Sequence, residues 1–325
     1  MPSSNSYDFS VTAANVITEA IENIGVLGVG GTIVTAHQTA MLRKLNLIAK
    51  QWMGSSDFAP GLKIFSRQRV ALFLGKGQHR YTVGPASTDA RAAVTYGRTT
   101  LSADEAAAQT VLSITSNTDT TTFPGTTVTM AASDIVGIEL DDGTIQWTTI
   151  SGTPASTMTV SVALTGAAKA GNYVYWFTSR AQRFLEIEAA VLRDENYNDT
   201  PLYIYRNVRE YSEGVTSKYS DGDPTSILVE PLVLNTAVTL DVQPQDVTKF
   251  IVLTVLYPSE DYDATTDTIA FPQVWYKPLA WQLAIDTAPS FGVAVTNEMK
   301  LNRDEALVIA RNANPENSVV YFQPG

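Results

Sequence analysis

Two histidines, His37 and His79, are the side chains most suited to acid–base or metal chemistry, and the chain has no cysteine. A catalytic triad needs a histidine between a nucleophile and an acid, and a three-histidine zinc site needs one more imidazole than is present. His37 falls in an expected helix and His79 at the start of an expected strand, with no reason to meet. We therefore expect ordinary core or surface histidines, no catalytic residue, no cofactor and no metal site. Packing alone must stabilise the fold, because there are no disulfides.

The acidic run Glu260, Asp261, Asp263 and Asp267 has the short spacing that oxygen-binding cations favour. The glutamate and glycine positions of a calcium loop are missing, so we expect a solvated loop. Carboxylate pairs of a glycoside hydrolase are defined by their distance in space, which a sequence does not supply. The glycines between 25 and 31 do not indicate a phosphate loop, because no strand precedes them and no Lys-Ser/Thr pair follows.

Arginine and tyrosine alternate in the stretch 180–211, the most basic and aromatic part of the chain. One reading is phosphate contact with base stacking, and another is a subunit interface, where both residue types are enriched. A third reading, which we favour, is a set of strands with one packed and one charged face. If the stretch does contain a subunit interface, Arg206, Arg209 and Tyr211 are its candidate residues. The stretch contains Arg180, Arg183, Arg193, Arg206 and Arg209 with Tyr197, Tyr203, Tyr205 and Tyr211.

Length, hydrophobic content and net charge limit the classes of protein to which the chain can belong. The chain has 325 residues, 44% of them hydrophobic, and a formal net charge of -11. It is long enough for two domains, or for one domain with a large insertion, and it lacks the basic surface of a DNA-binding protein. The start has no basic region followed by an apolar one, and no stretch offers the roughly 20 apolar residues of a membrane span. We expect a soluble protein, made inside the cell, with no membrane contact.

Apolar residues at three- and four-residue steps predict helices at both ends of the chain, over 11–24, 35–53, 279–288 and 295–313. Ser10 or Asp8 is the expected cap of the first helix, and Gly25 is its expected stop. Pro278 places the start of the third helix near Lys277. The middle of the chain lacks this helical spacing.

Short β-type runs fill the middle. A hairpin is expected from 69–74 and 78–83 around the turn at 75–77, and further strands over 184–187, 202–205, 226–230, 238–242 and 250–256. Between them, residues 98–175 read as an inserted β-sandwich, acidic and dispensable to the rest. We expect an α+β fold: a helical bundle platform with associated β strands (1–97 and 176–325, discontinuous) and an inserted small β-sandwich domain (98–175).

The C-terminal residues form an apolar cluster that is unusual for a free chain end. We expect it to dock on a partner. The cluster comprises Val319, Val320, Tyr321 and Phe322, followed by Gln323 and Pro324.

Several strings occur along the chain in a particular order. They are Ala40 to Ile48 with Trp52, Arg209-Glu210-Tyr211 with Lys218 and Gly222 to Thr225, Phe271-Pro272 with Trp275, Leu279 to Ala284, Glu316 to Val319 and Phe322-Gln323-Pro324, and, within the insertion, Ile138 to Thr144 and Trp147 to Thr149. Taken together, these strings resemble the head-to-tail connector proteins of short-tailed bacteriophages, also called adaptor, packaged-DNA stabilisation or tail accessory proteins. The resemblance covers most of the chain, although Pro278 interrupts a stretch that is helical in the family and smaller relatives lack the insertion.

The resemblance implies a non-enzymatic structural protein of the virion, made in the host cytoplasm and placed at the head–tail junction. Such proteins form a ring, commonly of twelve copies, under the portal, and they close and extend the channel for DNA ejection. The implied partners are other copies of the chain, the portal protein through residues 319–324, and tail nozzle or tail fibre proteins. DNA would pass without specific binding, which the acidic charge favours. Two alternatives are a connector-associated peptidoglycan hydrolase and a fibre- or nozzle-docking adhesion module formed by the insertion.

Overall fold

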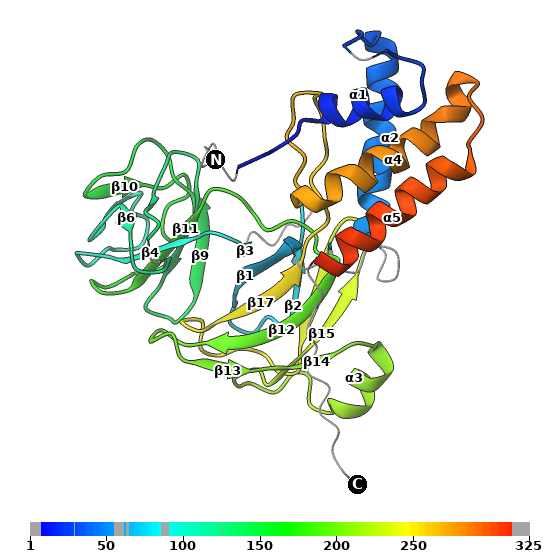
Figure 1. The fold of residues 1–325 in the computed structure, drawn as a ribbon. Coiled ribbons are helices and arrows are strands. Elements are labelled where there is room, and N and C mark those ends of the chain that lie inside the picture. The colour runs from blue at the N-terminus through cyan, green and yellow to red at the C-terminus, as the bar shows by residue number, and fades with distance from the viewer. Residues whose placement is uncertain are drawn as a thin grey trace, which may run out of the picture. The chain divides into compact units, whose positions relative to one another are not determined.

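The computed structural model describes residues 8–28, 30–54, 62, 65–85, 91–123 and 125–313. The chain forms two compact units (Figure 1). We call Met1–Arg67 with Pro258–Gly325 the terminal unit and Gln68–Tyr257 the central unit. The described residues form five α-helices and 17 strands in five sheets.

Four of the α-helices belong to the terminal unit, where α4 contacts α1, α2 and α5. The indole of Trp52 on α2 lies with its centroid 5.8 Å from that of Trp275 and 6.4 Å from the ring of Phe271. These buried rings join the two ends of the sequence in one core. The helices are α1 (Ala13–Asn23), α2 (Thr35–Gly54), α4 (Tyr276–Thr287) and α5 (Asn297–Ala313), with short 3-10 turns η2 (Gln273–Trp275) and η3 (Ala288–Phe291).

The predicted helix ends agree with the structure except at the first cap. Thr12 caps α1 through a capping box with Asn15, whereas Ser10 or Asp8 was expected. Gly25 takes a left-handed φ of 71°, as its role as a stop requires. Pro278 lies in the first turn of α4, where the N–H that proline lacks has no partner within the helix.

Two of the larger sheets of the central unit face each other. The middle sheet has the order β13-β12-β17-β1-β3, and the outer sheet has the order β14-β15-β16-β2, in which β14 runs parallel to β15. The middle sheet consists of β13 (Asp199–Pro201), β12 (Glu186–Arg193), β17 (Phe250–Leu256), β1 (Arg67–Phe73) and β3 (Ala92–Ala93). The outer sheet consists of β14 (Tyr203–Tyr205), β15 (Ser226–Pro231), β16 (Thr236–Leu240) and β2 (Arg80–Val83).

The insertion adds a third sheet of order β4-β11-β8-β9 and two small ribbons. Leu112 and Met158 of one ribbon pack with Ile138 and Trp176 of the sheet in a buried cluster of their own. The insert sheet is built from β4 (Gly97–Thr100), β11 (Tyr173–Phe177), β8 (Ile135–Glu139) and β9 (Ile145–Thr149). The ribbons are β5 (Val111–Ser113) with β10 (Thr157–Thr159), and β6 (Thr118–Asp119) with β7 (Val128–Thr129).

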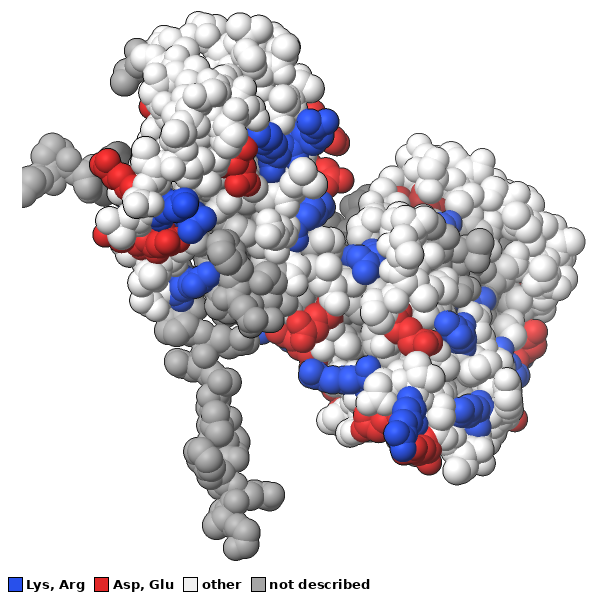
Figure 2. All heavy atoms as spheres, turned by 90° about the vertical axis from the view of Figure 1, so that its right-hand side faces the viewer, with Lys and Arg blue, Asp and Glu red and all other residues white. Residues whose placement is uncertain are grey.

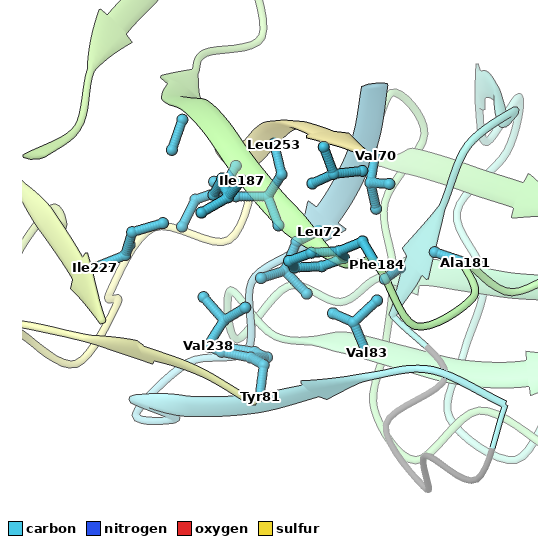
Figure 3. Packing of buried hydrophobic residues seen from close by; sticks show 14 of the residues in the cluster. Val70, Leu72, Tyr81, Val83, Ala181, Phe184, Ile187, Ile227, Val238 and Leu253 are labelled. Carbon is cyan, nitrogen blue, oxygen red and sulfur yellow. The ribbon is translucent and has the colours of Figure 1, made fainter. Parts of the chain in front are cut away.

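The second half of strand β1, residues 70–73, is buried on both faces. Successive side chains of a strand point to opposite sides, so these residues enter two different clusters. Val70 and Leu72 enter the inner cluster between the middle and outer sheets, which Figure 3 shows with Tyr81 and Val238 from the outer sheet. Phe73 points the other way, into an aromatic cluster shared with the insert sheet. The central unit therefore has three layers, with the middle sheet covered on both sides.

The aromatic cluster joins the insertion to the rest of the central unit. The ring of Phe73 lies with its centroid 4.9 Å from that of Tyr175, 5.3 Å from that of Trp147 and 5.5 Å from that of Phe250. Removing residues 98–175 would take two of these rings away and expose Phe73 and Phe250. This packing argues against an insertion that is dispensable to its neighbours, while the boundary at 98–175 stays a prediction.

The expected helical bundle platform is wrong. Strands dominate the described residues, and the helices are few and short, although the mixture of helix and strand agrees with an α+β composition. The helices predicted at the two chain ends are present. They do not form the main part of the fold, because the short strands between them bury three clusters of apolar side chains around the layered sheets.

A substitution at Gly97 tests the packing of the insert sheet. A Cβ atom added there would lie 2.1 Å from Cζ2 of the buried Trp176, its partner across β4 and β11. We expect Gly97→Ala to lower the free energy of unfolding by about 1–3 kcal/mol, measured by urea denaturation. Gly222→Ala is the matched control, because a Cβ at Gly222 meets no atom within 4 Å. Equal stability of the two variants would contradict the packing described for Trp176.

Candidate functional site

The two histidines lie in different units, each beside an aromatic ring. The imidazole of His37 on α2 has its centroid 5.1 Å from that of Phe291, and His79, just before β2, has its centroid 5.0 Å from that of Tyr219. Within the described residues, no three His, Asp or Glu side chains are grouped closely enough to hold a metal ion. No helix in the described ranges combines the length and the apolar content needed to cross a membrane.

The acidic run after β17 forms local contacts with its own loop and with α2. The carboxylate of Asp267 accepts the backbone N–H groups of Asp263 and Ala264, both at 2.8 Å. Asp261 forms an ion pair of 2.8 Å with Lys50. Asn46 of α2 accepts the N–H of Tyr262 and donates to its carbonyl, at 2.8 and 2.9 Å. These bonds hold the loop on α2.

The Arg–Tyr stretch divides into two groups. In the first, Tyr197 has a φ of 63° and lies at the turn between β12 and β13. The guanidinium carbon of Arg98 lies 4.8 Å from the centroid of its ring, and that of Arg193 lies 5.8 Å from it. Arg193 also donates two hydrogen bonds of 2.7 Å to Asp199, which hold the pKa of that carboxyl below its ordinary value. This group joins the insertion to β12 and β13.

The second group surrounds a helix in a stretch that was expected to be strand. Asn207 caps α3 (Val208–Gly214), because its side chain accepts the N–H of Glu210 at 2.7 Å. Asn followed three residues later by Glu is a signature of helix N-termini, so the signal was present in the sequence. Arg206 and Arg209 are exposed on this surface, and Arg209 pairs with Glu213 at 2.8 Å.

Tyr211, the third proposed interface residue, is 4% exposed. Its hydroxyl donates to the carbonyl of Leu240 at 2.6 Å, and its ring meets that of Tyr205 edge to face at 5.5 Å. The ammonium of Lys218 lies 5.0 Å from the ring centroid. The structure thus brings Arg206 and Arg209 to the surface and uses Tyr211 to hold α3 on the outer sheet. The interface role of the three residues stays a prediction.

A small cleft opens beside Arg206. Its volume is about 170 Å³, and Arg206 and Glu186 contribute charged groups to a wall that is otherwise mostly apolar. The remaining lining residues are Phe184, Leu185, Ile187, Ile204, Tyr205, Val229, Pro231 and Thr236. The space suits one side chain of a partner better than a drug-sized ligand, for which pockets of roughly 300–1,000 Å³ are usual.

Two exposed apolar surfaces were missed by the sequence analysis. One is the turn between β15 and β16, where Leu232, Val233 and Leu234 are exposed in succession. The other is the outer face of α5, which carries Leu301, Val308 and Ile309. The spacing of the α5 residues could have revealed a second apolar face, since positions i, i+7 and i+8 lie together on a helix.

Figure 2 shows one face of the molecule, where acidic and basic side chains form small groups between larger uncharged areas. The proposed portal-binding residues Val319, Val320, Tyr321, Phe322, Gln323 and Pro324 lie outside the described residues. Neither a family model nor a curated protein matches the chain.

The anchoring role of Tyr211 gives a test. We expect Tyr211→Phe to lower the free energy of unfolding by about 1–2 kcal/mol, because the buried carbonyl of Leu240 loses the hydrogen bond from the phenol. Tyr203→Phe is the control, since it removes an exposed hydroxyl that donates to Glu210. Chemical denaturation of both variants measures the difference, and an unchanged Tyr211→Phe would contradict this account of α3.

Proposed function

We propose that the chain is a non-enzymatic structural subunit of a phage head-to-tail connector ring, mounted under the portal and extending the DNA channel. Twelve copies, the number common in the family it resembles, would form the ring. Portal, tail nozzle and tail fibre proteins would be its other partners, and DNA would pass without specific binding. The two alternatives, a peptidoglycan hydrolase and an adhesion module, stay predictions that no described contact tests.

The observation that carries the proposal is that α5 presents apolar side chains on two faces. Met299, Ala306, Leu307 and Ala310 are buried. On its other side, Leu301, Val308 and Ile309 are 57%, 53% and 66% exposed. Contiguous exposed apolar side chains indicate a surface for another chain, and burying one such side chain contributes about 1.5–3 kcal/mol before the cost of association. This is what a subunit of an assembly requires.

Some of the strings that carry the resemblance also meet in space within the terminal unit. Trp52 follows the matching segment of α2, whereas Phe271 and Trp275 come more than two hundred residues later, and their rings pack together. These matches are therefore parts of one core. Their joint order supports a connector more strongly than any one of them would.

Ring formation is tested by the mass of the full chain, alone and mixed with purified portal rings, using native mass spectrometry or negative-stain microscopy. We expect a closed ring, and we expect Ile309→Lys to lose it while circular dichroism still shows a folded chain. Val162→Lys is the matched control, because Val162 is also exposed, at 56%, but lies in the insertion. A native chain that stays monomeric in both settings contradicts the proposal.

Portal docking is assigned to the C-terminal residues 319–324, whose apolar side chains would gain free energy by burial on the portal. Truncation after Ala313 keeps the whole of α5 and removes this segment. We expect the truncated chain to bind purified portal rings at least about tenfold more weakly, the equivalent of 1.4 kcal/mol, in a pull-down or interferometry assay. Undiminished binding would show that another surface contacts the portal.

A further inference from the structure

The exposed side of α2 combines apolar and basic groups above a groove. Arg43, Leu47 and Lys50 are exposed and follow one another at four- and three-residue steps, so they share one side of the helix. They border a groove of about 430 Å³ between α2 and the loop at 261–263. No acidic residue occurs between Thr35 and Gly54. We call Arg43, Leu47 and Lys50 with this groove the α2 face.

The exposed side of α5 has the complementary character. Leu301, Val308 and Ile309 form a ridge, and Glu305 lies among them, four residues after Leu301 and four before Ile309. We call these four residues the α5 face. An apolar ridge with a carboxylate at its centre matches a groove with an apolar residue and basic groups along one edge.

One charged side chain on each face, Arg43 on the α2 face and Glu305 on the α5 face, is available for a new contact. In the described part of the chain, neither Arg43 nor Glu305 forms an ion pair or a side-chain hydrogen bond. Lys50 is already paired with Asp261 across the groove, and Asp263 lines the same wall. A carboxylate entering the groove would therefore meet attraction on the Arg43 side and repulsion on the Asp263 side. This asymmetry sets the orientation of an incoming helix.

We infer that the α5 face of one copy of this chain docks in the α2 face of the next, with Glu305 facing Arg43. The inference rests on the proposed ring and names its contact. Both faces belong to the terminal unit, and α4 contacts both helices that carry them. Because the two faces differ and are exposed on the same chain, the contact is heterologous and repeats from copy to copy, as a ring demands.

Charge reversal tests the pairing. Arg43→Glu sets a second carboxylate against Glu305, and Glu305→Arg sets a second guanidinium against Arg43, so each variant alone repels its own copies. We expect each to lose the ring mass at a concentration where the native chain is assembled, with circular dichroism and melting temperature unchanged. Lys169→Glu, a reversal of an exposed charge in the insertion, should assemble normally.

Mixing the two variants should restore ring assembly, which two misfolded chains could not do. When they alternate, Glu305 of the first variant faces Arg43 of the second, and at the next contact the introduced guanidinium faces the introduced carboxylate. Every contact is then complementary. We expect equal amounts of the two to form a ring with strict one-to-one composition, and the double variant Arg43→Glu/Glu305→Arg to assemble alone. Raised salt should weaken all these rings, because the paired charges begin exposed.

The outcomes separate the contact from the proposed function. A native ring that tolerates both reversals, or single variants that fail to rescue each other although folded, overturns the α2–α5 contact and leaves the ring proposal standing. A native chain that remains monomeric with and without portal overturns both. Loss of assembly in the Lys169→Glu control would show a general charge effect and would likewise reject the specific pairing.

Discussion

The burial of the middle sheet on both faces is the constraint on which the central unit depends. Antiparallel sheets often leave one face to solvent, but β17 reads as an almost continuous apolar strand from Phe250 to Leu256. Phe250 and Val252 enter the aromatic cluster, while Ile251, Leu253 and Val255 enter the inner cluster. Such a strand is stable only if both neighbouring layers are present. The outer sheet and the insertion are therefore structural requirements of the same few strands.

This constraint explains which features could be predicted from the sequence. Local signals succeeded in several places. The β17 boundaries agree with the expected 250–256, and the four helices at the chain ends begin and end near their predicted residues. Tertiary features did not follow from local pattern. The alternation of apolar and polar residues in the insertion does not reveal that Trp147 and Tyr175 pack on Phe73, because the three residues are far apart in sequence. In the candidate site, exposure of Arg209 and burial of Tyr211 depend on α3, whose capping signature at Asn207 was overlooked.

Some of the acidic side chains have a local structural role as well. In the insertion, burial alone would raise the pKa of Asp119, but hydrogen bonds from Thr122, Thr121 and the Arg98 amide lower it overall. Hydrogen bonds from Thr144 likewise lower the pKa of Asp142, and those from Asn198 lower the pKa of Asp194. Each carboxylate stabilises a turn while it is ionised, and this contribution is lost as the pH falls through the lowered folded-state pKa. These three carboxylates thus hold local turns, independently of any effect on DNA.

The terminal unit is helical, and the packing of its helices affects how copies of the chain would assemble. A heterologous contact closes into a ring only if the rotation between neighbouring copies divides a full turn. With any other rotation the copies form a filament. In the proposed α2–α5 contact, that rotation would depend on how α4 holds the two helices. Leu279, Ala280, Leu283 and Ala284 of α4 are fully buried, and Lys44 of α2 donates at 2.7 Å to the carbonyl of Asp286 near the end of α4. Close-packed small and branched side chains leave little freedom for the angle to vary. The buried core of α4, which belongs to neither exposed face, is therefore the part of this chain that would determine the number of copies in a ring.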